Sequence, residues 1–233
     1  MTHKRIKPIN LLDSAVLRPE RLAAVDAVME VMTLARVPRA VPLHDYGCWR
    51  HAQWRSEENA LVPFLSVDWY VASAWDQSRM QVNGEIILTL LEEEPWRRSE
   101  LLGDHYDILI LDEDLYTAQP DWPDDFIVAI ARADVGAAIS THRLGSHRFT
   151  ILKTVVMHQL AHVFGVPQNG RDDLDRRWGL HCTHDCVMRY PEKTPQDWEV
   201  LTMDRFKYGP FCERCLKDLR QFFLTEEGQA AAE

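Results

Sequence analysis

The segment 153–168, KTVVMHQLAHVFGVPQ, contains two histidines four positions apart, His158 and His162. At this spacing two side chains lie on the same face of an α-helix, one turn apart. The apolar pattern predicts a helix over 149–165, with Gly165 as its C-cap. Two imidazoles on one helical face can bind a single metal ion. An isolated H-x-x-x-H pattern also occurs by chance on the polar flank of a helix. Residues further along the chain are needed to distinguish a metal site from two ordinary polar residues.

Four of the five cysteines lie in the last quarter of the chain, as the pairs Cys182 with Cys186 and Cys212 with Cys215. Two close pairs of thiolates suit a tetrahedral four-thiolate zinc site. A redox C-x-x-C pair is the alternative, but it is expected in a thioredoxin-like βαβ context, which does not precede CERC. We therefore predict a structural zinc site here, and an ordinary buried or half-buried thiol at Cys48.

These motifs together resemble the archaemetzincins, zinc-dependent metallopeptidases whose pattern runs H-E-x-x-H-x-x-G-x-x-H-C, then C-x-M, then C-x-x-C. The matching parts of this sequence are HQLAHVFG, the HC pair at 181–182, CVM at 186–188 and CERC at 212–215. The resemblance covers about residues 107–219. The first hundred residues match the family only vaguely.

The resemblance implies two zinc ions, one catalytic and one structural, and a peptide or protein substrate. It implies that His158, His162 and His181 hold the catalytic ion. Met188 would form the Met-turn beneath that ion, and Tyr190 is a candidate for stabilising the transition state. As alternatives, Met188 and Tyr190 are ordinary packing residues.

The position of the general base departs from the family pattern. H-E-x-x-H peptidases have a glutamate there, which accepts a proton from the attacking water, whereas this chain has Gln159. Glutamine has no proton affinity near neutral pH, so we expect the chain to bind zinc and peptide but to hydrolyse peptides poorly. The intact ligands and the isosteric change favour a deliberate Glu-to-Gln substitution in a peptidase. The alternative is a natural pseudopeptidase that binds peptides or proteins.

The spacing before His181 departs as well. Fifteen residues separate Gly165 from His181 where the family pattern has two, which predicts an insertion over 167–180. Gln168 stands at the position of the third ligand, and His184 lies close in sequence. We favour His181 because the adjacent cysteine belongs to the family pattern.

Hydrophobic periodicity predicts the remaining elements. Helices are expected over 17–35, 77–97 and about 212–224, and strands over 107–116, 126–133 and 135–145, the first two of them buried. The stretch 40–75 predicts loops and at most a strand, and 166–215 is loop-rich.

The expected fold class is α+β, a metzincin-like zinc-peptidase domain with a mixed twisted sheet over the active-site helix. We expect one domain over 1–233. Its upper lobe, 1–165, would include the helix 149–165, and its lower lobe, 166–233, would carry the third histidine, the Met-turn and the four-cysteine site.

Composition limits the partners. A formal net charge of -10 argues against binding to nucleic acid. The absence of a long apolar run and of a signal-peptide pattern predicts a cytoplasmic protein without a membrane partner. The acidic runs LEEEP (91–95) and RDDLD (171–175) are expected to be solvated charge, with no role as metal ligands.

Overall fold

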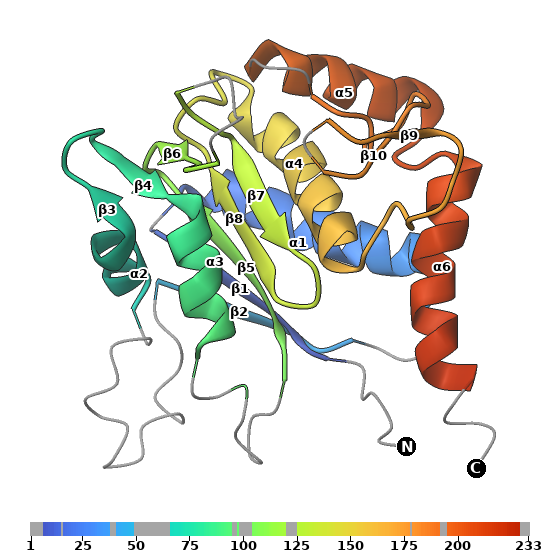
Figure 1. Ribbon diagram of the computed structural model, residues 1–233, viewed down its shortest axis with the longest axis horizontal. Coiled ribbons are helices and arrows are strands. Elements are labelled where there is room, and N and C mark those ends of the chain that lie inside the picture. The colour runs from blue at the N-terminus through green and yellow to red at the C-terminus, as the bar shows by residue number, and fades with distance from the viewer. Residues whose placement is uncertain are drawn as a thin grey trace.

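The computed structural model describes residues 7–14, 16–37, 41–48, 66–94, 97, 104–119, 125–177, 179–191 and 195–228. Its centre is a five-stranded mixed sheet in the order β2-β1-β5-β8-β7 (Figure 1). The first four strands are parallel, and β7 runs antiparallel to β8. The strand bounds are β1 Ile9–Asp13, β2 Leu43–Gly47, β5 Tyr106–Leu111, β7 Ala129–Arg132 and β8 Gly136–Ser140.

Helices cover both faces of this sheet. One face packs against α1 and α4, which also contact each other, and the other face packs against α2 and α3. The helix bounds are α1 Arg18–Ala35, α2 Val67–Ala74, α3 Gly84–Glu92 and α4 Arg148–Val163. The mixed composition of helices and sheets agrees with the predicted α+β class at this coarse level.

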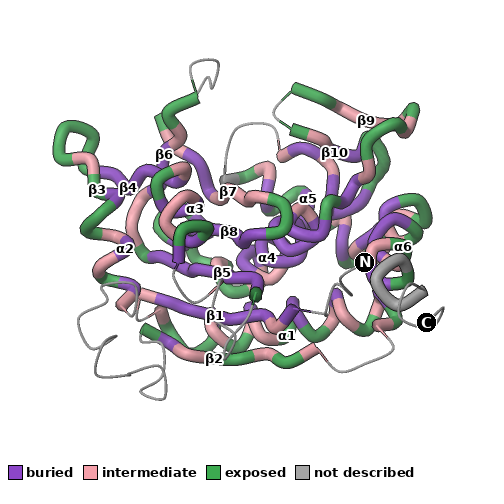
Figure 2. Tube along the Cα trace, turned by 60° about the horizontal axis from the view of Figure 1, so that its bottom comes forward, coloured by how far each residue is buried: buried purple, intermediate pink, exposed green. Residues whose placement is uncertain are grey.

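Side chains of the central strands alternate between two apolar cores, as the pleat of a strand requires. On β5, Tyr106, Ile108 and Ile110 belong to the core beneath α1 and α4, whereas Leu109 and Leu111 belong to the core beneath α2 and α3. Figure 2 shows the buried residues following β1, β5 and β8 through the centre of the molecule, with more exposed residues on β2. The strands that are buried on both faces are therefore mainly apolar, with buried polar residues at Asn10, Asp13 and Asp107.

Two predicted helices are confirmed in α1 and α4. The backbone N–H of Leu17 donates to the Glu20 carboxylate at 2.7 Å, which supplies a cap at the start of α1. After the end of α4, Gly165 has a φ of 71°, a left-handed conformation that glycine adopts without a Cβ clash. The predicted boundaries, 17–35 and 149–165, lie within one or two residues of those observed.

The predicted helix over 77–97 is wrong in its first part. A second, three-stranded sheet in the order β3-β4-β6 occupies part of this region, with bounds Trp75–Asp76, Gln81–Asn83 and Leu115–Tyr116. The side chain of Asn83 accepts the backbone N–H groups of Glu85 at 3.0 Å and Ile86 at 3.2 Å. Asparagine is a strong N-cap, so α3 begins only after it.

The strand predictions hold with two changes. The segment 107–116 holds β5 and then, after a turn, the short β6, and 135–145 contains β8. The segment 126–133 contains β7, whose residues are half-buried instead of buried. The reason is that β7 is the last strand of the sheet and has only β8 beside it among the described residues. The stretch 40–75 holds β2 and the unpredicted helix α2, and its residues 49–65 lie outside the described part.

Beyond α4 the chain forms a short hairpin and two helices. Their bounds are β9 Leu174–Asp175, β10 His181–Cys182, α5 Pro195–Tyr208 and α6 Glu213–Gly228. The closing helix is confirmed by α6, but the loop-rich prediction for 166–215 is wrong over α5. Apolar residues lie on more than one face of α5, since Trp198 and Leu201 are buried while Val200 and Met203 are exposed. A helix without a single apolar face gives no clear periodic signal.

Candidate metal centres

Three histidines from two parts of the chain meet beside α4. His158 and His162 come from α4, and His181 comes from β10. One ring nitrogen of each lies within 4.8 Å of the other two, and the Nε2 atoms of His158 and His162 are 3.0 Å apart. Neighbouring ligands of a tetrahedral zinc ion with bonds of about 2.0–2.1 Å are about 3.3 Å apart, so this spacing suits a zinc ion.

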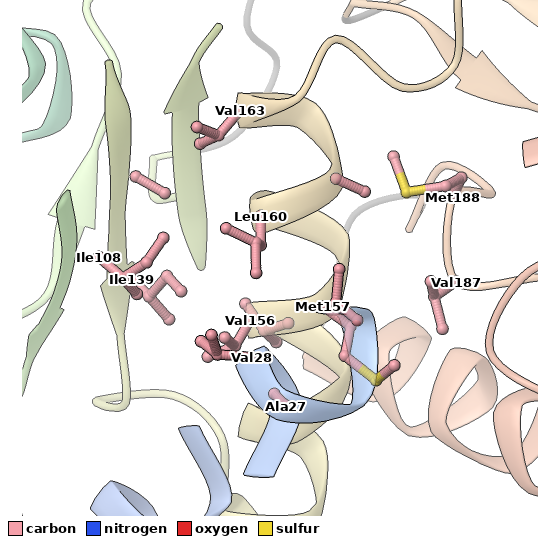
Figure 3. Close-up of a cluster of buried hydrophobic side chains, with 14 of the residues drawn as sticks. Ala27, Val28, Ile108, Ile139, Val156, Met157, Leu160, Val163, Val187 and Met188 are labelled. Carbon is pink, nitrogen blue, oxygen red and sulfur yellow. The ribbon is translucent and has the colours of Figure 1, made fainter. Parts of the chain in front are cut away.

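The backbone below the histidines sets the tautomer of His158. Its Nδ1 lies 2.5 Å from the carbonyl oxygen of Val187 and donates to it, which leaves the lone pair of Nε2 free for a cation. The neighbouring Met188 is fully buried beside α4, where Figure 3 shows it together with Val187. The turn predicted at Met188 therefore lies against the histidine helix and supports one of its histidines through a backbone carbonyl.

Burial keeps these imidazoles neutral. It lowers the pKa of His158 to about 3, with a smaller effect from the nearby His181. Burial likewise lowers the pKa of His181 to about 4, and it holds the pKa of His162 well below its usual value. A neutral imidazole is the form that binds a metal, so the three histidines are ready ligands at neutral pH.

Both alternatives for the third ligand, His184 and Gln168, make polar contacts with other residues. His184 is half-exposed, and its Nε2 is 3.2 Å from the Asp173 carboxylate. The backbone N–H of Gln168 donates to the Asp218 carboxylate at 3.0 Å, which ties that residue to α6. Among the described His, Cys, Asp and Glu side chains, the group of potential ligands at α4 is completed by His181 and does not include His184.

The four clustered cysteines also converge. All four are free thiols, and Cys186 and Cys215 are fully buried. The Sγ atoms of Cys182 and Cys212 are 3.7 Å apart, and those of Cys186 and Cys215 are 3.9 Å apart. These distances far exceed a disulfide bond of about 2.05 Å. They match the edge of a zinc tetrahedron with Zn–S bonds of about 2.3 Å, which is about 3.8 Å.

Hydrogen bonds among the four cysteines shift the pKa values of their thiols in opposite directions. Hydrogen bonds among the thiols lower the pKa of Cys182 to about 7 and also lower that of Cys212. The same contacts raise the pKa values of Cys186 and Cys215, because their neighbours then carry the charge. Four thiolates this close repel one another, so their full ionisation needs a bound cation.

Comparison with known proteins identifies a distant relative of this chain. The chain is similar to the archaemetzincin of Nanoarchaeum equitans (strain Kin4-M). The two sequences are 27% identical over 147 residues, which make up 63% of this chain and 67% of that protein. No protein-family model matches the sequence.

Two further predicted residues lie at the histidine group. Gln159 follows His158 on α4 and is 5% exposed. The ring of Tyr190 packs edge-on against that of His181, with 4.9 Å between the ring centroids. The sequence did not indicate Trp198 on α5, whose ring packs edge-on against His158 at 5.1 Å. No motif marks this tryptophan, because its role depends on where α5 lies.

Three expectations about charge and burial are wrong. Cys48 is exposed rather than buried. The acidic run 91–95 is not all solvated, since Glu94 is 1% exposed. In the run 171–175, Asp172 is exposed, but Arg171 and Asp173 pair beside the cysteine cluster with side-chain exposures of 12% and 10%. The two errors about acidic residues arise because sequence composition does not reveal a buried partner.

A third group of ligand-type residues lies on the opposite face of the sheet. It consists of Glu94, His105 and Asp107, all buried. The Nε2 atom of His105 is 3.1 Å from each of the two carboxylates, and Arg97 pairs with Asp107 at 2.9 Å. Tyr70 also donates a hydrogen bond to Glu94. Protein charges balance one another here, so the arrangement is a buried ion-pair network.

None of the described helices is long and apolar enough to cross a bilayer.

Proposed function

We propose that this chain has the fold and zinc sites of a metallopeptidase related to the archaemetzincins, and that Gln159 leaves it with little or no peptide hydrolysis. His158, His162 and His181 would hold the catalytic zinc ion, and the four clustered cysteines would hold a structural one. The observation that carries the proposal is the convergence of three neutral imidazoles at α4, of which His158 and His181 are buried and His162 is half-buried. The distant similarity to an archaemetzincin supports the choice of reaction class.

The residues around the histidines have separable tasks in this proposal. A zinc ion bound there would polarise the scissile carbonyl and lower the pKa of water. The Gln159 amide can hydrogen-bond to water but cannot accept its proton, so the general base is missing. Tyr190, which packs against His181, is the candidate donor to the developing oxyanion.

The edge strand β7 offers a binding position for an extended peptide. This strand is the outermost of its sheet in the described part of the chain, and it lies next to α4 (Figure 1). A peptide can add to such an edge through backbone hydrogen bonds. We propose that the substrate pairs with β7 and crosses the histidine group.

Gln159 itself supports a second function. A site that keeps its zinc ligands and loses its general base can bind peptides without cleaving them, so the chain would act as a pseudopeptidase that recognises a peptide or protein. The codon at position 159 of the natural gene separates a natural pseudopeptidase from a deliberate substitution.

The variant Gln159→Glu tests the proposal. General-base catalysis contributes about 10²- to 10⁴-fold, so hydrolysis of a broad peptide library should increase by that order without a change in zinc content. A chelator should abolish the activity. The matched control is Gln221→Glu, which places the same new charge at an exposed position of α6 and should stay inactive. Retained zinc without cleavage in the Gln159→Glu variant would reject the peptidase and favour the binding protein.

A further inference from the structure

Arg171 lies in the insertion 167–180 and directs every N–H group of its guanidinium to a defined acceptor. Nε and Nη2 donate to the two carboxylate oxygens of Asp173 at 2.8 and 2.5 Å. Nη1 donates to Asp218 at 2.6 Å. The two remaining N–H groups point to the sulfur atoms of Cys215 and Cys182, each at 3.5 Å. Arginine has five such donors, and all five are used.

The two sulfur atoms belong to different parts of the fold. Cys182 ends the hairpin strand β10, and Cys215 lies in the first turn of α6. Asp173 precedes β9, the partner strand of β10, whereas Asp218 lies on α6. Arg171 therefore links the hairpin to α6 twice, once through carboxylates and once through cysteine sulfur atoms.

The charge of the guanidinium matters as much as its position. Four thiolates around a divalent cation leave a net negative charge of two. This charge would be largely removed from water, since Cys182, Cys186 and Cys215 are fully buried. Hydrogen bonds from a cation to thiolates stabilise their ionised form. The two carboxylates hold the planar guanidinium in the orientation that reaches both sulfur atoms.

We propose that Arg171 is a positioning residue of the four-cysteine zinc site, and that part of the role of the insertion is to deliver it. The proposal rests on the proposed function, because it requires zinc at the four cysteines. Removal of groups that orient metal ligands typically lowers metal affinity by about 10- to 100-fold. We expect a loss of that size when the guanidinium is removed.

The test uses the full-length protein loaded with Co²⁺ or Zn²⁺ alone. The sulfur-to-cobalt charge-transfer band reports the cysteine site specifically, and competition with a chelator gives its zinc affinity. Arg171→Met should lower that affinity by about 10- to 100-fold and move the band to lower energy, because the sulfur lone pairs lose their hydrogen bonds. Arg171→Lys keeps the charge but lacks the fork, so it should lose less affinity than Arg171→Met.

The matched control is Arg176→Met, in the same insertion. Arg176 is exposed, donates to the Asn169 side chain at 3.1 Å and should leave both readouts unchanged. Wild-type affinity and an unshifted band in the Arg171→Met and Arg171→Lys variants would overturn the inference. If Arg171→Met does not fold, Arg171→Lys alone decides by the same two readouts. A wild-type chain with no charge-transfer band would instead refute the proposed cysteine zinc site.

Discussion

The two faces of the central sheet carry buried histidines with opposite chemistry. On the face covered by α2 and α3, burial alone would lower the pKa of His105, but the carboxylates of Asp107 and Glu94 outweigh it and raise this pKa to about 9. Beside α4, on the other face, burial lowers the pKa of His158 to about 3 and that of His181 to about 4. The first histidine is a cation within a salt-bridge network, and the others are neutral bases.

The balance of charge distinguishes the candidate metal centres from an ion-pair network made of similar residue types. The Glu94 group contains its own positive charges, His105 and Arg97, so it needs no ion. The α4 histidines and the clustered thiols combine free lone pairs with mutual repulsion, and a divalent cation relieves both. Proximity of ligand-type side chains is therefore not sufficient, because the balance of charge decides.

The largest effect should come from breaking the four-cysteine group. Zinc binding at thiolate sites contributes about 10 kcal/mol or more in zinc-finger peptides, so Cys215→Ser should remove one zinc ion. Loss of even about 3 kcal/mol would lower the melting temperature by about 6–12 °C. Elemental analysis and thermal unfolding measure both effects. The exposed Cys48 provides the control Cys48→Ser, and equal behaviour of the two variants would refute the zinc site.

The second effect concerns the network without an ion. Arg97→Met should destabilise the fold by about 3–5 kcal/mol, because it leaves the buried Asp107 carboxylate without this partner, and the zinc content should stay at the wild-type value. Chemical denaturation and elemental analysis test this. Arg132→Met is the control, since Arg132 pairs with the exposed Glu92 near the surface and its loss should cost at most about 1 kcal/mol. Loss of zinc from the Arg97→Met variant would contradict the conclusion that the Glu94, His105 and Asp107 group needs no ion.

The third effect is an opposite response of the two faces to pH. The pKa of His105 is raised on folding, so its contribution of about 3 kcal/mol is full below pH 6.5 and is lost as pH rises through about 9. In the zinc-free protein the lowered pKa values of His158 and His181 affect stability at acidic pH. Their contribution is full above pH 6.5 and falls as pH decreases towards about 4.

Denaturation midpoints between pH 4 and 10, with and without zinc, measure both trends. His105→Gln should remove the alkaline step and leave the acid one. An alkaline step of unchanged size in that variant would show that His105 is not its source.

The smallest effect should come from His184→Ala. This side chain is half-exposed and outside the α4 histidine group, so stability should change by no more than about 0.5 kcal/mol and both zinc ions should remain. His181→Ala, three positions away, should empty the histidine site. If His184→Ala empties the histidine site and His181→Ala does not, then His184 and not His181 is the third ligand.

The sequence by itself determined the local parts of both centres. His158 and His162 share a face because a helix turns once in 3.6 residues, and Gly165 ends that helix. The cysteine pairs are close because only three and two residues separate their members. The buried strand β5 and the helices α1, α4 and α6 were likewise predictable, since each has a strong periodic or apolar pattern.

Only the tertiary structure decided the rest. His181 reaches α4 from β10, Trp198 packs on His158 from α5, and Arg171 contacts two cysteines. Glu94 is buried through contacts with His105 and Tyr70, although Glu92 and Glu93 are exposed. These features depend on residues far apart in the chain, and short-range spacing carries no information about which distant segment will supply a partner or a counter-charge.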